Sequence, residues 1–363
     1  MRILYDATPL LMRSAGVKNY HHALLVRLLP RLRPHQLRLF PFLDSVGRNH
    51  NERSNYSGAA TLPRLAAVLA SNYLRLPVGE WAARKADLFH LTPHLMHPPS
   101  RPRLTSMVHD PTPLLHPEWH TAGNVRYFRH FAGRLLPRLA GIIVPSQAVK
   151  RDLAEHHPRI TVIPHGVDPD FFPPGPLEPE RRAYDLPDRY LLFLGSLEPR
   201  KNLATLLDAY RLLPEELRHE YPLVIGGASG WKNRPLRRRL QAEQAAGLRL
   251  IGYVPPAALP LVYAGASVFV FPSLYEGFGM PVLEAMAGGA PVVTSNLSAL
   301  PEVTGDAALL VDPRSPSELA KAIQRVLGDS ELAERLREAG RRRARELTWE
   351  KTALATKAFF EQI

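Results

Sequence analysis

The chain has 363 residues, of which 22% are charged and 45% hydrophobic, and it contains no cysteine. This length predicts two domains, each large enough to bury a core of its own. The lack of cysteine excludes a disulfide scaffold, a cysteine nucleophile and a thiolate metal site. No stretch approaches the roughly 20 apolar residues of a membrane-spanning helix, and residues 1–9 lack the pattern of a secretory signal. We therefore expect a cytoplasmic protein.

Charge is distributed unevenly along the chain, whose net charge is +12. Residues 1–175 contain 22 lysines and arginines against 11 aspartates and glutamates, together with 14 of the 15 histidines. Residues 176–363 contain 24 basic and 23 acidic residues and are nearly neutral. A basic half and a neutral half predict two domains with different partners. Nucleic acid, an anionic membrane and a phosphorylated substrate each fit the basic half.

Short apolar runs alternate with amphipathic stretches in the first half, which is typical of a parallel α/β sheet. The expected strands are Arg2–Tyr5, Leu37–Pro41, Asp87–Leu91, Leu104–Val108, Gly141–Val144 and Ile160–Ile163. The expected helices are Val17–Leu29, Leu62–Leu74, Ala122–Leu139 and Ser146–His156. Proline and charge without periodicity then indicate a linker over 172–186, after a first domain of 1–171.

The same alternation resumes in the second half and ends in helices. Strands are expected near Tyr190–Leu194, Leu223–Ile225, Leu248–Ile251, Val268–Phe271, Pro291–Thr294 and Ala308–Val311. Helices are expected over Ser315–Leu327, Asp329–Glu346 and Trp349–Gln362. The predicted fold class is α/β, with two Rossmann-like domains, 1–171 and 187–346, and a cleft between them at the carboxyl ends of both sheets.

The stretch 268–295 has the features of a site that binds an anion. A strand is followed by a loop with Gly277 and Gly279, and Pro281 suits the first residue of a helix, where its missing N–H costs nothing. The glycines let a ligand approach the backbone, and free amides at a helix start attract negative charge. The plain alternative is a loop before an exposed helix with solvated glutamates.

Two carboxylates belong to this stretch: Glu276 in the loop and Glu284, expected on the first turn of the helix. On one continuous helix they would lie about 12 Å apart, farther than the roughly 5–10 Å of a glycosidase pair. We expect Glu276 to fold back over the loop and Glu284 to face another part of the same ligand. A diphosphate at the amides would leave one acid for each flanking sugar, as acids bridge ribose hydroxyls in dinucleotide folds.

A second candidate site lies in residues 194–210, where a strand exits through Gly195 and Ser196. Arg200 and Lys201 follow beside the start of a helix, which is a poor place for positive charge unless an anion binds there. The alternative is a solvated pair that caps a turn.

Two features of the first domain extend this pattern. Gly16 precedes an amphipathic helix and offers a second phosphate-approach loop, or a simple helix-start turn. His109 ends a strand at its carboxyl edge, where an imidazole can donate to a sugar hydroxyl or a developing charge. The spacing of His90, His94 and His97 raises zinc as an alternative, but neighbouring prolines argue against the helix that this ligand set needs.

Residues 126–138 are expected to carry a basic helical face opposite an apolar one. Its members are Arg126, Arg129, Arg134 and Arg138. A solvated surface helix explains this face, and so does a surface that meets anionic lipid headgroups or a phosphorylated acceptor.

The motifs GSLEPRKN and PSLYEGFGMPVLEAMAGGAPVV closely resemble those of the group 1 glycosyltransferases, also called family 4. These are retaining enzymes of the GT-B fold, and the resemblance covers most of the chain. Residues 144–146 and 162–168 resemble the signals at the end of the family's first domain. Trp349 resembles the tryptophan before the family's last helix, here 347–363, which crosses back onto the first domain.

By this resemblance the second domain holds a nucleotide-sugar donor, with no metal or other cofactor. Glu284 would hold the ribose hydroxyls, and Glu276 would meet the donor sugar. Lys201 and Arg200 would neutralise the diphosphate. Further donor contacts are implied for Gly16, Gly195, Ser196, Tyr253, Val254, Gly277, Phe278, Gly279, Met280 and Pro281.

The chain departs from the family pattern at two positions. Ser196 stands where many members carry an arginine, so that Arg200 would supply this charge from beside Lys201. His165 stands where asparagine is common.

The implied reaction is transfer of a hexose with retention, and His109, Lys201 and Glu276 are its expected catalytic residues. The diphosphate leaves, an oxocarbenium-like state forms, and an acceptor hydroxyl attacks from the same face. GDP-mannose is the favoured donor, while UDP-glucose and other nucleotide sugars stay open. The acceptor is a glycan, a lipid-linked sugar or a small molecule.

Two other classes of protein remain as alternatives. One is a GT-B-like binding protein without catalysis, against which the joint presence of His109, Lys201, Glu276 and Glu284 argues. The other is a nucleic-acid-binding protein, which the basic half suggests by charge but without a zinc-finger or RNA-recognition signature. We expect the basic half to face an anionic acceptor or the inner surface of a membrane, and nucleic acid to be no partner.

Overall fold

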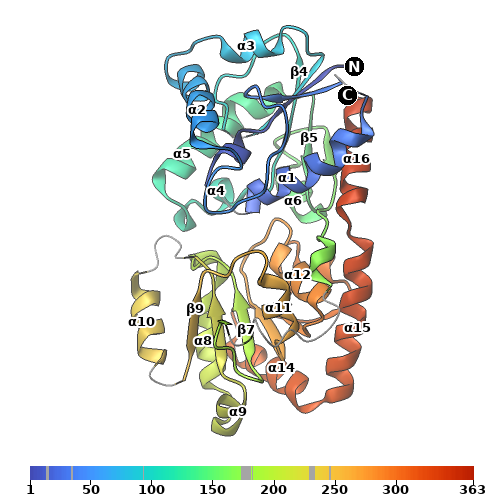
Figure 1. The fold of residues 1–363 in the computed structure, drawn as a ribbon. Helices are drawn as coiled ribbons and strands as arrows, with labels where there is room; N and C mark the ends of the chain where they lie inside the picture. Colours follow the sequence, from blue (N-terminus) through green and yellow to red (C-terminus); the bar gives the residue numbers. More distant parts are fainter. Residues whose placement is uncertain are drawn as a thin grey trace. The chain divides into compact units, whose positions relative to one another are not determined.

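The computed structural model describes residues 1–13, 16–33, 36–92, 94–172, 181, 183–228, 234–244 and 247–363. They form two compact units (Figure 1). Unit 1 comprises Met1–Leu114, Gly123–Gly166 and Trp349–Ile363, and unit 2 comprises Leu115–Ala122 and Val167–Thr348. Most of the predicted linker 172–186 lies outside the described residues.

Unit 1 is built on a six-stranded parallel sheet of order β2-β1-β3-β4-β5-β6. All six predicted strands are confirmed to within one residue at each end. The four inner strands are buried along nearly their whole length, as parallel sheets require, and the two edge strands are more exposed. The strands are β1 (Ile3–Asp6), β2 (Leu37–Phe40), β3 (Leu88–Leu91), β4 (Arg103–Met107), β5 (Gly141–Val144) and β6 (Ile160–Val162).

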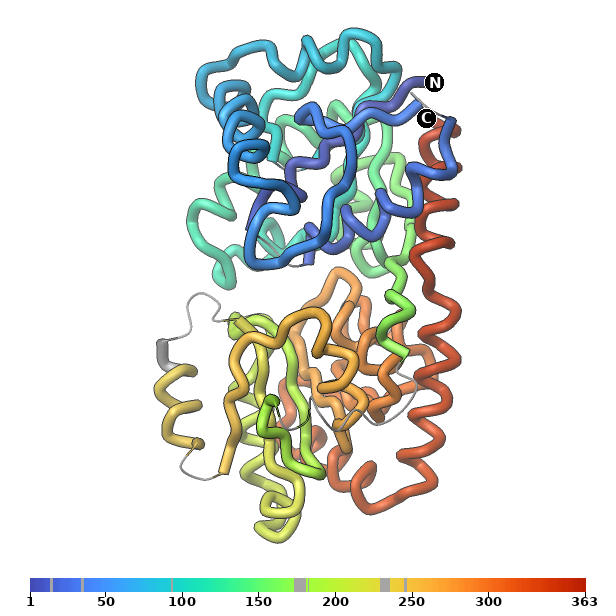
Figure 2. Tube along the Cα trace, in the orientation of Figure 1, coloured from blue at the N-terminus to red at the C-terminus, as the bar shows by residue number. Residues whose placement is uncertain are grey.

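Helices cover this sheet, and the last helix of the chain is one of them. That helix, α16, packs against α1, and Figure 2 shows the red C-terminal helix beside the blue N-terminal segment. The predicted return of the C-terminal helix to the first domain is therefore confirmed. The helices are α1 (Gly16–Leu28), α2 (Gly58–Tyr73), α3 (Val78–Ala83), α4 (Thr112–Leu115, which extends into unit 2), α5 (Ala122–His130, which begins there), α6 (Gln147–Leu153) and α16 (Trp349–Gln362).

The predicted helix Ala122–Leu139 is not one regular α-helix. After α5 the chain forms a π-turn over Phe131–Leu135 and a 3₁₀ turn over Leu136–Arg138. Pro137 lacks the N–H that a regular α-helix would pair with the carbonyl four residues earlier, so the α-helical hydrogen bonding does not continue through it. The four arginines of the predicted basic face are exposed, as expected: Arg126, Arg129, Arg134 and Arg138.

Unit 2 repeats the same design with a second six-stranded parallel sheet, of order β12-β11-β10-β7-β8-β9. Its six strands also confirm the predicted ones to within one residue. They are β7 (Leu191–Leu194), β8 (Leu223–Gly226), β9 (Arg249–Gly252), β10 (Val268–Phe271), β11 (Val292–Ser295) and β12 (Ala308–Val311).

Eight helices of unit 2 lie within its described residues. Helix α12 packs on α15, where Gly340 admits the Met286 side chain: a Cβ at position 340 would lie 3.2 Å from the Cβ of Met286. Ser315 and Asp329 cap the starts of the last two helices by accepting backbone N–H bonds. The eight are α8 (Leu203–Arg211), α9 (Glu215–Glu220), α10 (Arg234–Gln244), α11 (Leu259–Ala264), α12 (Met280–Gly288), α13 (Leu300–Thr304), α14 (Pro316–Gly328) and α15 (Ser330–Glu346).

Candidate active site

A buried cluster of opposite charges occupies one edge of the unit 2 sheet. Nζ of Lys201 lies 2.6 Å from Oε1 of Glu276, and Nη1 of Arg200 lies 2.8 Å from Oε2 of the same carboxylate. Glu276 is 6% exposed and Lys201 5%. The structure therefore brings together two motifs that are separate in the sequence. Arg200 and Lys201 come from one of them and Glu276 from the other.

Neighbouring strands bring these motifs together. β7 and β10 pair in parallel, so the loops that follow them leave the sheet at the same edge. Asn202, in the left-handed conformation with φ of 57°, donates from its side chain to the carbonyls of Pro272 and Pro313. The amide of Leu274 donates to the carbonyl of Arg200 at 2.8 Å. These bonds fix the cation loop against the Glu276 loop.

Glu198 is a member of this cluster that the sequence analysis did not select. It is 4% exposed, lies 3.4 Å from Nη2 of Arg200, and accepts a hydrogen bond from the Ser196 hydroxyl at 2.5 Å. Arg200 therefore lies between two carboxylates, and Ser196 orients one of them. A signal was present, because Glu198 stands two residues before Arg200 inside the GSLEPRKN motif.

Electrostatics keep Glu276 ionised despite its burial. Burial alone would raise the pKa of its carboxyl, but Arg200, Lys201 and a hydrogen bond from Ser273 hold this pKa down, at about 2. Burial and the nearby Arg200 lower the pKa of Lys201, which Glu276 and Glu198 oppose. The anion beside these two cations is thus supplied by the protein itself.

Helix α12 begins directly after the glycine loop, as predicted. Gly279 precedes it with φ of 107°, a conformation open to glycine and strained for other residues, and Pro281 lies in its first turn. Met280 and Pro281 are half-buried, and Phe278 is buried. The backbone amide of Glu276 donates to the Ser298 hydroxyl at 2.9 Å, which anchors the loop.

Glu284 is the fifth residue of α12, so the prediction that it lies on the first turn is wrong. The helix starts at Met280, one residue before Pro281, and Glu284 begins its second turn. Tyr263 donates its hydroxyl to Oε2 of Glu284 at 3.0 Å. Burial raises the pKa of this half-buried carboxyl to about 8, with a smaller contribution from Asp168 in the same direction.

The predicted glycine at the end of β7 has a partner that the sequence did not indicate. A Cβ on Gly195 would make only ordinary contacts, the nearest 3.5 Å from Phe193. Gly227, with φ of 141°, is more constrained, since its Cβ would lie 1.9 Å from the Gly195 carbonyl oxygen. The close approach of the backbone after β8 to the backbone after β7 therefore depends on glycine at position 227.

Two of the implied donor contacts, Tyr253 and Val254, follow β9. Gly252 ends that strand with φ of 67°, Tyr253 is 37% exposed, and Val254 is buried. In unit 1, Gly16 is the exposed first residue of α1, and a Cβ added to it would have nothing within 4 Å among the described residues.

His109 belongs to a buried aromatic cluster of unit 1. Its Nδ1 lies 3.4 Å from Nε2 of His165, and its ring centroid lies 4.5 Å from that of Tyr20. Burial lowers the pKa of His109 to about 4 and that of His90 to about 3, so both imidazoles are neutral near pH 7. Nε2 of His109 has no hydrogen-bond partner among the described residues.

The histidines considered for zinc do not form a ligand set. His90 lies on strand β3 rather than a helix and bonds Thr105 through Nδ1 at 3.0 Å. Among the residues that the structure describes, no group of three or more His, Cys, Asp or Glu side chains is arranged to hold a metal ion.

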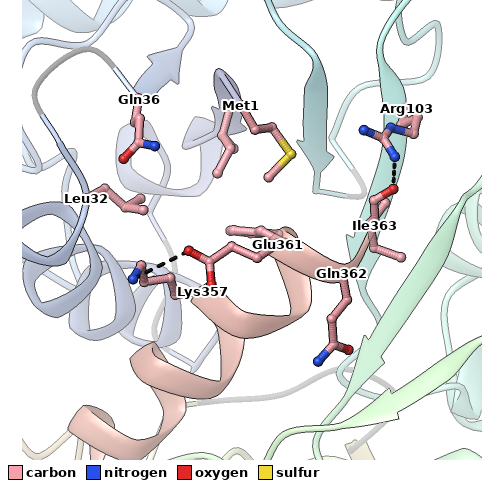
Figure 3. A pocket seen from close by; sticks show the side chains of 10 residues that line it. Met1, Leu32, Gln36, Arg103, Lys357, Glu361, Gln362 and Ile363 are labelled. Carbon is pink, nitrogen blue, oxygen red and sulfur yellow. Dashed lines mark hydrogen bonds and ion pairs between the residues drawn. The ribbon is translucent and has the colours of Figure 1, made fainter.

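A cavity of about 440 Å³ lies elsewhere in unit 1 (Figure 3). Arg103, Lys357, Glu361 and the two ends of the chain line it, and Arg103 donates to the carbonyl oxygen of Ile363. It contains none of the predicted site residues. In the described part of the chain, no helix is long and apolar enough to cross a membrane.

Two Rossmann-like sheets, with a buried ion-pair cluster and a glycine loop before a helix at an edge of the second, agree with the GT-B fold expected from the sequence. Residues 177–343 match the family model "Glycosyl transferases group 1", and residues 18–171 match "Glycosyltransferase Family 4". The O-antigen chain mannosyltransferase B of Escherichia coli is 32% identical, with 98% of each chain covered. The chain therefore belongs to the group 1, family 4 glycosyltransferases, enzymes that transfer sugars.

Solved structures agree on the fold. A sucrose-phosphate synthase from Thermosynechococcus elongatus superposes with a TM-score of 0.73 at 21% identity, over 100% of this chain and 99% of that one. HepE from Anabaena, in complex with UDP and glucose, gives a TM-score of 0.71 at 17% identity over the full length of both chains.

Proposed function

We propose that this glycosyltransferase moves mannose, with retention, from GDP-mannose to a hydroxyl of a glycan or lipid-linked acceptor, without a metal ion. The similarity to a mannosyltransferase over 98% of the chain supports the sugar. The observation that carries the proposal is the buried contact of Glu276 with Arg200 and Lys201 beside the loop that starts α12. This arrangement offers a diphosphate two cations beside the N-terminal end of α12, where the helix dipole favours negative charge.

Arg200 and Lys201 stabilise the departing diphosphate in this proposal. Their positive charge is already held in a site with little access to water, so no reorganisation is needed as negative charge develops on the leaving group. They take the place that a divalent cation has in other transferases. The departing phosphate oxygen accepts the proton of the attacking hydroxyl, which approaches the anomeric carbon from the same face.

Glu276 positions the donor sugar and stabilises the oxocarbenium-like state by its charge. Its pKa of about 2 keeps it ionised throughout the neutral range, but the same cations weaken it as a nucleophile. A role in positioning and electrostatic stabilisation therefore fits better than a covalent intermediate.

Glu284 and His109 complete the proposed donor contacts. Glu284 accepts from the ribose hydroxyls, with Tyr263 holding its carboxylate in place. His109 is half-buried and neutral near pH 7, and its Nε2, which is unpartnered within the described structure, suits a hydrogen bond to a hydroxyl of the transferred sugar.

A UDP-sugar is the alternative donor, since HepE binds UDP and glucose on the same fold. The alternative that is not an enzyme is a protein of the same fold that binds a sugar nucleotide without transferring its sugar. For the proposed enzyme we place the reaction in the cytoplasm, with the protein in peripheral contact with the inner face of an anionic membrane.

The decisive experiment is a thermal-shift and hydrolysis screen against GDP-, UDP-, ADP- and dTDP-sugars in the presence of a chelator. We expect GDP-mannose to raise the unfolding temperature most and to release mannose, with NMR of a transferred product showing the α-anomer. A stronger effect of UDP-glucose would reassign the donor. No effect of any nucleotide sugar would contradict the proposed function.

A further inference from the structure

Helix α2 presents its large apolar side chains to solvent. Leu62, Ala66, Leu69 and Tyr73 recur at the spacing of one helical face and are all exposed, with Leu62 at 69% and Tyr73 at 75%. The residues that this helix buries are Thr61, Val68 and Ser71. A helix that only covers its sheet would show the opposite pattern.

The apolar surface continues beyond the end of α2. Leu74 and Leu76 in the following turn are 71% and 46% exposed, and Trp81 on α3 is 62% exposed. Figure 1 shows α2 and α3 next to each other, and the two helices are in contact. We call the following set the α2–α3 surface: Leu62, Ala66, Leu69, Tyr73, Leu74, Leu76 and Trp81.

This concentration is unusual for a surface exposed to water. Six of the fifteen large hydrophobic side chains that are exposed in the described structure fall between Leu62 and Trp81. Single exposed apolar residues are ordinary, whereas a contiguous patch marks an interaction site. Tyr73 and Trp81 are of the residue types that favour the boundary between headgroups and acyl chains.

Positive charge borders the α2–α3 surface. Arg75, Arg84 and Lys85 are exposed and lie next to or within a few residues of its members in the sequence. Residues 58–85 contain one acidic residue, Glu80, whose carboxylate accepts hydrogen bonds from the backbone and hydroxyl of Ser100 at 2.7 and 2.9 Å. Within residues 58–85, exposed positive charge therefore outweighs negative charge.

This charge distinguishes between the possible occupants of the surface. A two-fold contact with a second copy would bring two basic surfaces together, which costs free energy. An anionic bilayer accepts the apolar side chains at its interface and attracts the cations at the rim. We infer that the α2–α3 surface docks this protein on a membrane rich in anionic phospholipids, with α2 lying in the plane of the interface.

The basic face at Arg126, Arg129, Arg134 and Arg138, expected from sequence to meet lipid, has a different character. Its large apolar residues Phe131 and Leu135 are buried and Phe128 is half-buried, so its exposed side chains are mainly charged. It attracts an anionic surface at long range and inserts nothing, which makes it a matched control for charge alone.

The test is flotation of the full chain with vesicles of phosphatidylcholine, with or without about 30 mol% phosphatidylglycerol. We expect binding to be at least about tenfold stronger to the anionic vesicles and to weaken with added salt. The variant L69S/Y73S/L74S should lose about tenfold or more of that binding, since three side chains no longer transfer to the interface. Quenching of Trp81 by brominated lipid should disappear in W81F.

The control variant L212S/L354S removes two side chains that are 56% and 54% exposed outside this surface, and should bind like wild type. Equal binding to both vesicle types, unchanged binding of L69S/Y73S/L74S, or an equal loss in the control would overturn the inference. So would a wild-type dimer in solution that L69S/Y73S/L74S dissociates, because the surface would then be an interface between copies.

The inference extends the membrane contact named under the proposed function and does not depend on the donor. GDP-mannose should shift the unfolding temperature of L69S/Y73S/L74S as it shifts that of wild type. If the protein binds vesicles but no nucleotide sugar changes its unfolding temperature, the proposed donor is refuted and the docking surface stands. If GDP-mannose raises the unfolding temperature but the protein does not bind vesicles, the docking surface is refuted and the donor stands.

Discussion

Nζ of Lys201 lies 2.6 Å from Oε1 of Glu276, and both side chains are almost fully buried. A diphosphate that enters this site competes with Glu276 for the same cations. Glu276→Gln should therefore preserve or strengthen the affinity for GDP while it lowers the transfer rate by about 100-fold or more, because charge at the sugar is lost. Isothermal titration with GDP and a radiochemical transfer assay measure the two effects.

Glu198→Gln is the matched control for this variant. It removes the other carboxylate beside Arg200 but leaves the contact of Lys201 with Glu276 in place. We expect a smaller loss of transfer than in Glu276→Gln. Equal losses in the two variants would show that Glu276 acts only through the charge of Arg200 and would contradict its placement at the sugar.

Glu284 should make the stability of the donor-free protein depend on pH. Its pKa is about 8 in the folded protein against 4.5 for the free side chain. The stability it contributes is thus complete below about pH 4.5 and is lost as pH rises through about 8. Relative to wild type, Glu284→Gln should become more stable between about pH 5 and 9, on the order of 2 kcal/mol for this half-buried side chain.

Urea unfolding of both proteins at these pH values tests this prediction, with GDP absent. The same substitution should weaken GDP-mannose binding, since an amide NH₂ replaces one of the two oxygens that can accept from the ribose hydroxyls. A constant difference in stability across the pH range would show that Glu284 is ionised in the donor-free protein.

Buried histidines should make unit 1 sensitive to acid. The pKa of His90 is lowered to about 3 from 6.5, so its contribution to stability is present above about pH 6.5 and is lost as pH falls toward 3. The variant H90L/T105V removes the imidazole together with its hydrogen-bond partner. The pH slope of its unfolding free energy should be shallower than that of wild type by about 1.4 kcal/mol per pH unit between about pH 4 and 6.

His219→Leu provides the comparison, because that side chain is 81% exposed on α9. Its slope gives the baseline for losing one exposed histidine. If H90L/T105V retained the wild-type slope in urea titrations, His90 would take up no proton on unfolding and its burial would carry no electrostatic cost.

Local patterns were sufficient to predict the strands of both units. Each buried parallel strand has its own apolar run bounded by turn residues, so residues near in sequence decide it. The two motifs of the site could be found for the same reason. Their meeting at Glu276 depends on β7 and β10 being neighbours, and sequence alone does not state that pairing.

Features that depend on distant residues were missed. Position 227 requires glycine because a Cβ there would collide with the Gly195 carbonyl oxygen. Glu198 joins the site because its carboxylate lies 3.4 Å from the Arg200 guanidinium. Residues 115–122 belong to unit 2 although the chain around them belongs to unit 1. The exposure of the apolar face of α2 could not be predicted either, since periodicity shows that a helix has two faces but not which of them is buried.

The start of α12 should tolerate no side chain at Gly279. Its φ of 107° is strained for alanine, and the added Cβ would lie 2.6 Å from Cδ2 of Leu300. Gly279→Ala should lower the free energy of unfolding by about 2 kcal/mol or more and weaken GDP binding, because the helix amides shift. Gly252→Ala is the control: φ is 67° and no atom of the described residues lies within 4 Å of the added Cβ, so only the backbone cost of about 1 kcal/mol remains. Urea midpoints and GDP titrations of both variants test this, and equal stability losses would place the constraint in the backbone rather than in the packing of Leu300.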